Sequence, residues 1–434
     1  MRPVSHGFAR LTTKYNSTAL HFFLFFLLFY AFLALFVRAQ SARDPDSVFF
    51  QPTAYDLSYS ALRLEQADVF IDKVEQQSSE IEIPKASSQP HLCVGFATIA
   101  RSGRRYFRSA VGTVLEGLSE TERADIYLIT LIAHTDPPQH PAYNETWLHK
   151  VVDRVLLYNS TGVDIDVDID YLRSLEATEK KMDAKLKALF DYIFLLKACE
   201  AVGAPHIVIL EDEIVAQDGW YHRTRAAIES AEEQTQEIKA SKWLYLCLFY
   251  TILGWNSRDW PIFLFYSVIA IAFVASSFLG YRQYQPSSRT IISNEIILIA
   301  CGVCTPLLIG LYFAAGRATM CPIPQGVHQM PHYASCSQAF AFPRTRVSDI
   351  VGWYSEKGIR EANNLLEEFA DNKEIRWAVT PSIVQHVGRN NSKTNKKGSV
   401  ARLWNFEFEM NDPDVLREEH DRANNQGYSH FLGT

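Results

Sequence analysis

The stretch His206-Ile-Val-Ile-Leu-Glu-Asp-Glu213 indicates the fold most directly, because an apolar run leads straight into three acids. Such a short run, rich in β-branched residues, is typical of a buried strand in a parallel sheet. Predicted strands and helices alternate around it, which favours an α/β domain with a mostly parallel sheet flanked by helices. Ligands bind such sheets at the carboxyl ends of the strands. We therefore expect the three acids to lie at a ligand-binding edge.

The sequence on either side predicts the neighbouring elements. Residues 38–90 are largely polar and contain several prolines, which predicts a stem with a helix near residues 58–75. Hydrophobic periodicity then predicts the first elements of the α/β domain. The expected strands are residues 91–99, 124–133 and 151–158, and the expected helices are residues 106–118 and 179–202.

The acids suit a metal ion. Carboxylates provide the hard oxygen ligands that Mg²⁺ and Mn²⁺ prefer, and a metal can neutralise a diphosphate leaving group. The alternative is a plain acidic turn, and in either case we expect Asp212 and Glu213 to be solvated and to contribute little to stability. Thr98, Ala100 and Arg101 follow the first predicted strand. We expect them at the same edge of the sheet.

Three apolar stretches are long enough to cross a bilayer: residues 20–37, 261–281 and 291–315. We interpret the first as a signal anchor, although a cleaved signal peptide is the alternative. The last two form a hairpin inside the α/β domain. Arg2, Arg10 and Lys14 precede the first stretch.

The positive-inside rule predicts the topology of these stretches. It places residues 1–19 and the Arg-containing loop 282–290 in the cytosol. The stem at residues 38–90 and the two parts of the α/β domain, residues 91–260 and 316–434, are then luminal. Membrane lipids are an expected partner, and the net charge of −7 offers no basic surface for nucleic acid.

The lumen permits disulfides, and the chain has seven cysteines. Cys321 and Cys336 could close a loop. Pairing among the cysteines upstream of the hairpin is equally open, because connectivity cannot be deduced from sequence. Those upstream are Cys93, Cys199 and Cys247, whereas Cys301 and Cys304 lie within a predicted span and are poor candidates.

Three motifs resemble those of known families. Residues 210–215, Leu-Glu-Asp-Glu-Ile-Val, resemble the metal-binding element of the branching N-acetylglucosaminyltransferases of the fourth class. They are similar also to that of the Golgi N-acetylgalactosamine transferases of GPI anchors, the post-GPI-attachment factor family. Lys187, Asp191 and Tyr192 match a helix of both, and residues 381–388 resemble their Pro-Ser/Asn-Leu-Val/Phe-Gln-His-Ile/Val-Gly segment. The hairpin inside the domain is a feature of the GPI family alone.

The resemblance implies a GT-A glycosyltransferase fold interrupted by the membrane hairpin and an N-terminal anchor, and residues 243–255 resemble the strand after the metal motif. It implies Glu213 and His386 as ligands of Mn²⁺ or Mg²⁺. It implies an inverting reaction that needs a carboxylate base. The donor-binding residues it implies for a UDP-sugar are Thr98, Ala100, Arg101, Lys187, Asp191, Glu211 and Asp212, with Asp212 also in a catalytic role.

Two positions depart from the family pattern. Glu213 replaces the usual Asp, and Asn363 stands where the family has the Asp base. An amide cannot accept the proton of the acceptor hydroxyl. Glu361 and Glu367 are therefore the candidate bases.

By this resemblance, the chain is expected to be a three-span Golgi membrane enzyme. It would transfer N-acetylgalactosamine from UDP-GalNAc to the glycan of GPI-anchored proteins. An N-glycan-branching transferase is the alternative enzyme. A non-catalytic membrane scaffold with a decayed GT-A fold is the alternative outside enzymes.

Overall fold

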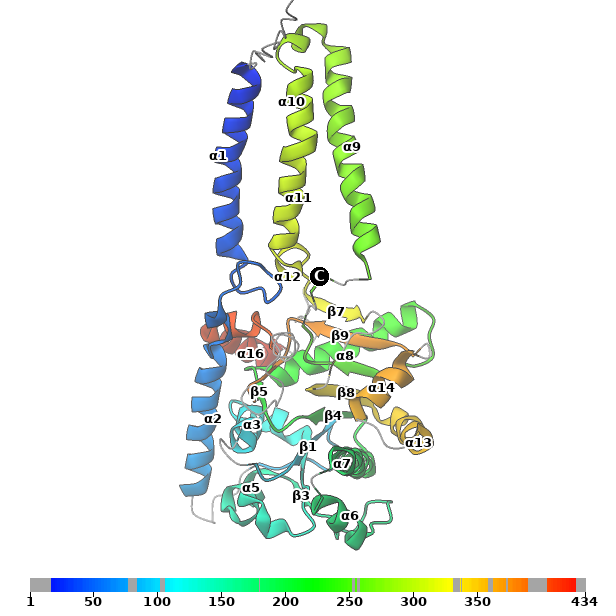
Figure 1. The fold of residues 1–434 in the computed structure, drawn as a ribbon. Helices are drawn as coiled ribbons and strands as arrows, with labels where there is room; N and C mark the ends of the chain where they lie inside the picture. The colour runs from blue at the N-terminus through cyan, green and yellow to red at the C-terminus, as the bar shows by residue number, and fades with distance from the viewer. Residues whose placement is uncertain are drawn as a thin grey trace, which may run out of the picture. The chain divides into compact units, whose positions relative to one another are not determined.

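We describe the protein from a computed structural model (Figure 1). The chain divides into two compact units, residues 1–54 with 252–322, and residues 55–251 with 323–434. Each unit is considered by itself. The structure describes residues 17–76, 84–101, 106–178, 180–251, 254–255, 258–330, 336, 338–357, 362–371, 374–388 and 404–426.

The second unit is built on an eight-stranded sheet with the order β3-β2-β1-β4-β8-β6-β9-β7. The pairs β3-β2, β2-β1, β1-β4 and β6-β9 are parallel, whereas β8 and β7 pair antiparallel to their neighbours. The predicted mostly parallel α/β architecture is thereby confirmed. The strands are β1 (Leu92–Thr98), β2 (Ile126–Ile132), β3 (Arg154–Leu156), β4 (His206–Leu210), β6 (Tyr245–Cys247), β7 (Gly326–Gln329), β8 (Ala339–Pro343) and β9 (Arg376–Thr380).

Helices cover both faces of this sheet, as expected, because alternate side chains of each buried strand point to opposite faces. Val94 and Val208 belong to one hydrophobic cluster, and Cys93 and Ile207 belong to the other. The first cluster includes residues of α3 (Tyr106–Leu115), α5 (Thr146–Val151) and α8 (Trp220–Glu237). The second includes residues of α6 (Ile169–Glu176), α7 (Lys181–Val202), α13 (Val347–Lys357) and α14 (Ala362–Asp371).

The helix predicted near residues 58–75 is confirmed as α2 (Tyr59–Gln76), and it packs against the domain. Ile71 and Val74 bury their side chains in the first hydrophobic cluster. A Cβ at Gly112 of α3 would lie 2.8 Å from the Cβ of Ala67, so glycine is needed where the two helices meet. Much of the predicted stem is therefore part of the folded unit.

Glycines in the left-handed region follow the ends of two predicted helices. α3 ends at Leu115, three residues before its predicted end, and Gly117 follows with φ 86°. α7 ends at Val202, as predicted, and its cap Gly203 has φ 86°. The strand predicted at residues 151–158 is shorter, because α5 occupies its start and only β3 pairs with β2.

Two disulfides tie helix and loop segments to the sheet. Cys93 of β1 bonds Cys199 of α7, and Cys247 of β6 bonds Cys336 just before β8. The suggested Cys321–Cys336 pair is wrong, because β8 runs beside β6 and brings Cys336 to Cys247.

Among its described residues, the first unit contains three helices that are long and apolar enough to cross a membrane. They are α1 (Ser17–Gln40), α9 (Trp260–Tyr284), and a continuous helical segment from Asn294 to Ala314. The third includes a π-helical turn, Ala300–Cys304, directly before Thr305-Pro306, where proline lacks the amide for a regular bond. The three predicted spans thus coincide with helices. Their orientation and the Golgi location stay predictions.

Candidate functional site

Four parallel strands end at one edge of the sheet and place the predicted site residues there. Phe96 of β1 is level with Leu210 of β4, and Thr98 is level with Ile132 of β2. The segments that follow these strands are therefore neighbours. They carry Arg101 after β1 and the acidic segment, defined here as Glu211, Asp212 and Glu213, after β4.

Asp212 is bound from the β1 side. The hydroxyl of Thr98 donates to Asp212 Oδ2 at 2.9 Å, and Arg101 lies 2.7 Å from Asp212 Oδ1. Arg101 also pairs with Glu213 while remaining 34% exposed. Burial raises the pKa of Asp212 to about 6, although Arg101 and Thr98 act in the opposite direction. The expectation of solvated carboxylates is wrong, because Asp212 is 5% and Glu213 is 7% exposed.

His386 reaches the acidic segment through a two-stranded ladder. β5 (Ile214–Ala216) pairs antiparallel with β10 (Val384–His386), and His386 is level with Ile214. The amide of Val387 donates to the carbonyl of Glu213 at 2.9 Å. A Cβ on Gly388 would overlap the Glu213 carboxylate, so glycine at this position leaves the room that this side chain occupies.

The imidazole of His386 faces two carboxylates without a hydrogen bond to either. Its Nε2 lies 3.5 Å from Glu213 Oε2 and 3.7 Å from Glu211 Oε2. Its Nδ1 is buried and has no hydrogen-bond partner among the residues that the structure describes. Burial lowers the pKa of His386, against the influence of Glu213. A neutral imidazole is the form that binds metals.

A pocket opens beside the acidic segment. Asp212, Glu213, Thr98 and Arg101 contribute to its wall. His140 also lines it, with Nε2 3.1 Å from the Thr98 hydroxyl. The pocket thus joins acidic, basic and hydroxyl groups at the predicted edge.

Lys187 and Asp191 form a buried network at the ends of β2 and β3. Lys187 Nζ donates to Asp191 Oδ2 at 3.0 Å, to the Tyr158 hydroxyl at 2.7 Å and to the carbonyl of Ala133 at 2.7 Å. Tyr158 donates to Asp191 Oδ1 at 2.5 Å. Both side chains are buried, so they do not form a pair on the helix surface. They order the segments that follow two strands.

Ala100 is placed beside this network. Its amide donates to His134 Nε2 at 2.8 Å, and His134 follows β2. Burial, followed by the charge of Lys187, lowers the pKa of His134. The contact links the loop after β1 to the loop after β2.

Of the two predicted catalytic bases, the structure describes Glu367. Glu367 of α14 accepts from the Tyr245 hydroxyl at 2.6 Å and from Arg376 at 2.7 Å. Burial raises the pKa of Glu367 to about 7. No hydrogen bond or ion pair joins Glu367 to the acidic segment within the described ranges. Glu361 and the side chain of Asn363 lie outside the described residues.

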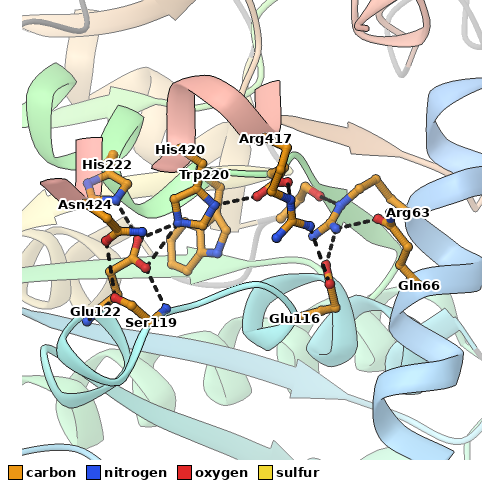
Figure 2. A network of polar contacts seen from close by, with 12 residues as sticks. Arg63, Gln66, Glu116, Ser119, Glu122, Trp220, His222, Arg417, His420 and Asn424 are labelled. Carbon is orange, nitrogen blue, oxygen red and sulfur yellow. Dashed lines mark hydrogen bonds and ion pairs between the residues drawn. The ribbon is translucent and has the colours of Figure 1, made fainter. Parts of the chain in front are cut away.

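A second polar cluster, absent from the sequence interpretation, lies where α4 (Glu120–Ala124), α8 and α16 (Pro413–Gln426) meet (Figure 2). His420 Nε2 lies 2.9 Å from Glu122 Oε1, and His222 Nε2 lies 2.7 Å from the same oxygen. Burial raises the pKa of Glu122, but the two histidines outweigh it and hold this pKa well below its ordinary value.

The cluster continues through Asp218 and Arg417 toward Arg63 of α2 (Figure 2). His420 Nδ1 lies 2.6 Å from Asp218 Oδ1. Burial lowers the pKa of His420, but its hydrogen bonds to Asp218 and Glu122 outweigh burial and raise it to about 9. His420 and Glu122 are separated by 298 residues, so no local pattern could have joined them.

Neither the models of protein families nor the curated proteins include a match to this chain.

Proposed function

We propose that this chain is a membrane-bound, metal-dependent, inverting glycosyltransferase of the GT-A type. It would transfer a sugar, N-acetylgalactosamine by resemblance, from a UDP donor to the glycan of GPI anchors. One observation carries the proposal. The acidic segment faces His386 at the same sheet edge where Thr98 and Arg101 bind Asp212.

The donor atoms fit Mn²⁺ or Mg²⁺. Glu213 and His386 would hold the ion, with Glu211 beside them, since His386 Nε2 lies 3.5 and 3.7 Å from their oxygens. An ion with bonds of about 2.1 Å needs adjacent ligand atoms about 3 Å apart, so small side-chain movements suffice. An imidazole ligand favours Mn²⁺ over Mg²⁺. Bound there, the ion would neutralise the diphosphate leaving group.

The protein's own groups would orient the donor. Arg101 is partly exposed, and it can turn from the two carboxylates to a phosphate once a cation neutralises them. Asp212 is held by Thr98 and can accept hydrogen bonds from a sugar or ribose hydroxyl. Lys187 and Asp191 would act on the pocket indirectly, by ordering the loops beside it.

Inversion requires a base that removes the proton of the attacking hydroxyl. Glu367 has a suitable pKa, but Tyr245 and Arg376 bind its two oxygens. The proposal therefore keeps Glu361 and Glu367 as the candidates.

A donor screen tests the enzyme proposal. The full chain in detergent is incubated with UDP-GalNAc, UDP-GlcNAc and UDP-galactose, and UDP release is measured with Mn²⁺ or with excess EDTA. We expect release with UDP-GalNAc that EDTA abolishes, because the diphosphate needs the cation. Absence of binding and release with every UDP-sugar would instead support the non-catalytic scaffold.

The two spans inside the domain support the choice of acceptor, because a GPI glycan lies close to the bilayer. Tethering the catalytic domain to the bilayer by these spans would raise the effective concentration of such an acceptor. An N-glycan-branching enzyme has no such need.

Replacing residues 261–315 with a Gly/Ser linker tests the acceptor. We expect UDP release to persist, because every proposed donor and metal ligand lies outside this segment. Transfer to GPI-anchored proteins in cells is expected to fall by about tenfold or more. Thermal melting with UDP and Mn²⁺ verifies folding. A folded variant that modifies GPI-anchored proteins as well as the wild type would refute the choice of acceptor.

A further inference from the structure

The strongest feature outside the proposed active site is the cluster of Glu122, His222 and His420, named here the Glu-His-His cluster (Figure 2). Each residue comes from a different helix, α4, α8 or α16. One ligand atom from each lies within 4.8 Å of the others. The three residues are 0%, 2% and 3% exposed, so the donors are shielded from solvent.

The donor atoms converge on one point. Glu122 Oε2 accepts from the amide of Ser119 at 2.7 Å, which fixes the carboxylate, and Oε2 also lies 3.1 Å from His420 Nε2. Oε1 lies 2.7 Å from His222 Nε2 and 2.9 Å from His420 Nε2. The two ring nitrogens therefore face the same carboxylate group.

A second carboxylate orients one of the rings. Asp218 Oδ1 lies 2.6 Å from His420 Nδ1, and Arg417 Nε lies 2.5 Å from Asp218 Oδ2. Metal-binding histidines commonly donate their other ring N–H to a carboxylate in this way, which leaves Nε2 as the ligand atom. The cluster thus has an outer shell as well as three ligands.

We propose that the Glu-His-His cluster binds Zn²⁺ and that this ion locks α16 onto α4 and α8. Two imidazoles and one carboxylate are a common zinc ligand set, and a fourth tetrahedral position is left for water or another oxygen. Bonds of about 2.0 Å require ligand atoms about 3.3 Å apart, so the side chains must separate by only about half an ångström. The competing occupant is a proton on His420, shared between Glu122 and Asp218.

The position of the cluster suits a structural ion. Glu122 and His420 are 298 residues apart, and His222 lies between them in sequence. An ion bound by all three closes long loops, and its binding energy becomes folding energy. Removal of the ion is therefore expected to loosen α16 rather than to alter the ligands of the proposed active site.

Metal content of the full chain in detergent tests this directly. After incubation with ZnCl₂ and desalting, we expect about one Zn²⁺ per wild-type chain by mass spectrometry, and less than about a tenth in His222→Gln. His206→Gln is the matched control. His206 also lies 2.9 Å from a glutamate, Glu232, but this pair is near the surface and outside the Glu-His-His cluster. Asp212→Asn should likewise retain the Zn²⁺.

A second measurement protects the test against misfolding of the variant. Wild-type protein stripped with a chelator is titrated with Co²⁺, which reports tetrahedral coordination by strong visible absorption, and its melting temperature is followed. We expect both the absorption and a rise in melting temperature. Wild-type protein that retains no Zn²⁺ and shows no response to Co²⁺ would overturn the proposal in favour of the shared proton. Equal Zn²⁺ in the wild type and in folded His222→Gln would also overturn it.

Discussion

Asp212→Asn is expected to lower metal-dependent UDP release by at least about a hundredfold, because it removes the anionic acceptor that is proposed to orient a ribose or sugar hydroxyl of the donor beside the metal. The amide keeps the shape of the carboxylate and can still accept the 2.9 Å hydrogen bond from Thr98. Arg101 retains Glu213 as an anionic partner. The loss should therefore appear in turnover with only a small change in melting temperature.

Glu232→Gln provides the control for this prediction. Glu232 is a carboxylate that pairs with His206 at the opposite end of β4, away from the edge that carries the acidic segment. We expect its UDP release to match the wild type, measured with saturating Mn²⁺ and UDP-sugar. Wild-type turnover by Asp212→Asn would exclude the proposed role of Asp212 in binding the donor. Turnover of the unmodified protein in excess EDTA would exclude the proposed metal role.

The elements around the acidic segment were predictable because they are local in sequence. Continuous apolar runs predicted the ends of β1 and β2 to within two residues. A helical pattern of apolar residues that continues up to Gly203 predicted α7. β3 was overestimated, because the same apolar stretch supplies the end of α5 and a short strand. Periodicity does not mark that division.

The site was only partly predictable. The rule that ligands bind at carboxyl strand ends placed Thr98, Arg101 and the acids together. It did not predict that Asp212 and Glu213 are buried, since Gly388 after β10 lies directly against the Glu213 carboxylate. His386 joins the acids through the short β5–β10 ladder, so its candidacy rested on resemblance.

The second polar cluster and the disulfide partners show why the remainder was not predictable. Glu122 lies in the middle of a five-residue helix, and His420 lies in a polar helix without an apolar run. Neither signals a buried contact. Cys336 bonds Cys247 because β8 lies beside β6. This neighbourhood depends on the strand order of the sheet, which local sequence does not reveal.

Lys187→Met is expected to be the most destabilising single change among those considered, with a loss of about 3 to 5 kcal/mol of unfolding free energy. Lys187 is buried and donates to Asp191, Tyr158 and the carbonyl of Ala133. Removing it leaves a carboxylate in the interior with a single hydroxyl donor. By the usual relation between unfolding free energy and melting temperature, this loss corresponds to a fall in melting temperature of roughly 10 °C.

Lys197→Met on the same helix is the matched control. Lys197 pairs with Glu200 at 2.8 Å, but both side chains are partly exposed, so the change should cost about 0 to 1 kcal/mol. The double change Lys187→Met with Asp191→Leu should recover part of the loss, because it removes the unpaired carboxylate as well. Melting curves of the full chain in detergent compare all three.

The destabilisation should also depend on pH. Burial already raises the pKa of Asp191 despite Lys187, and loss of the lysine must raise it further. A carboxyl group whose pKa is higher in the folded than in the unfolded state favours folding at low pH, and this advantage is lost as the pH rises. The melting-temperature gap between Lys187→Met and the wild type should therefore be smaller at about pH 5 than at about pH 8. If the gap for Lys187→Met equals that for Lys197→Met at both pH values, the network of Lys187, Asp191 and Tyr158 does not hold the segments that follow β2 and β3.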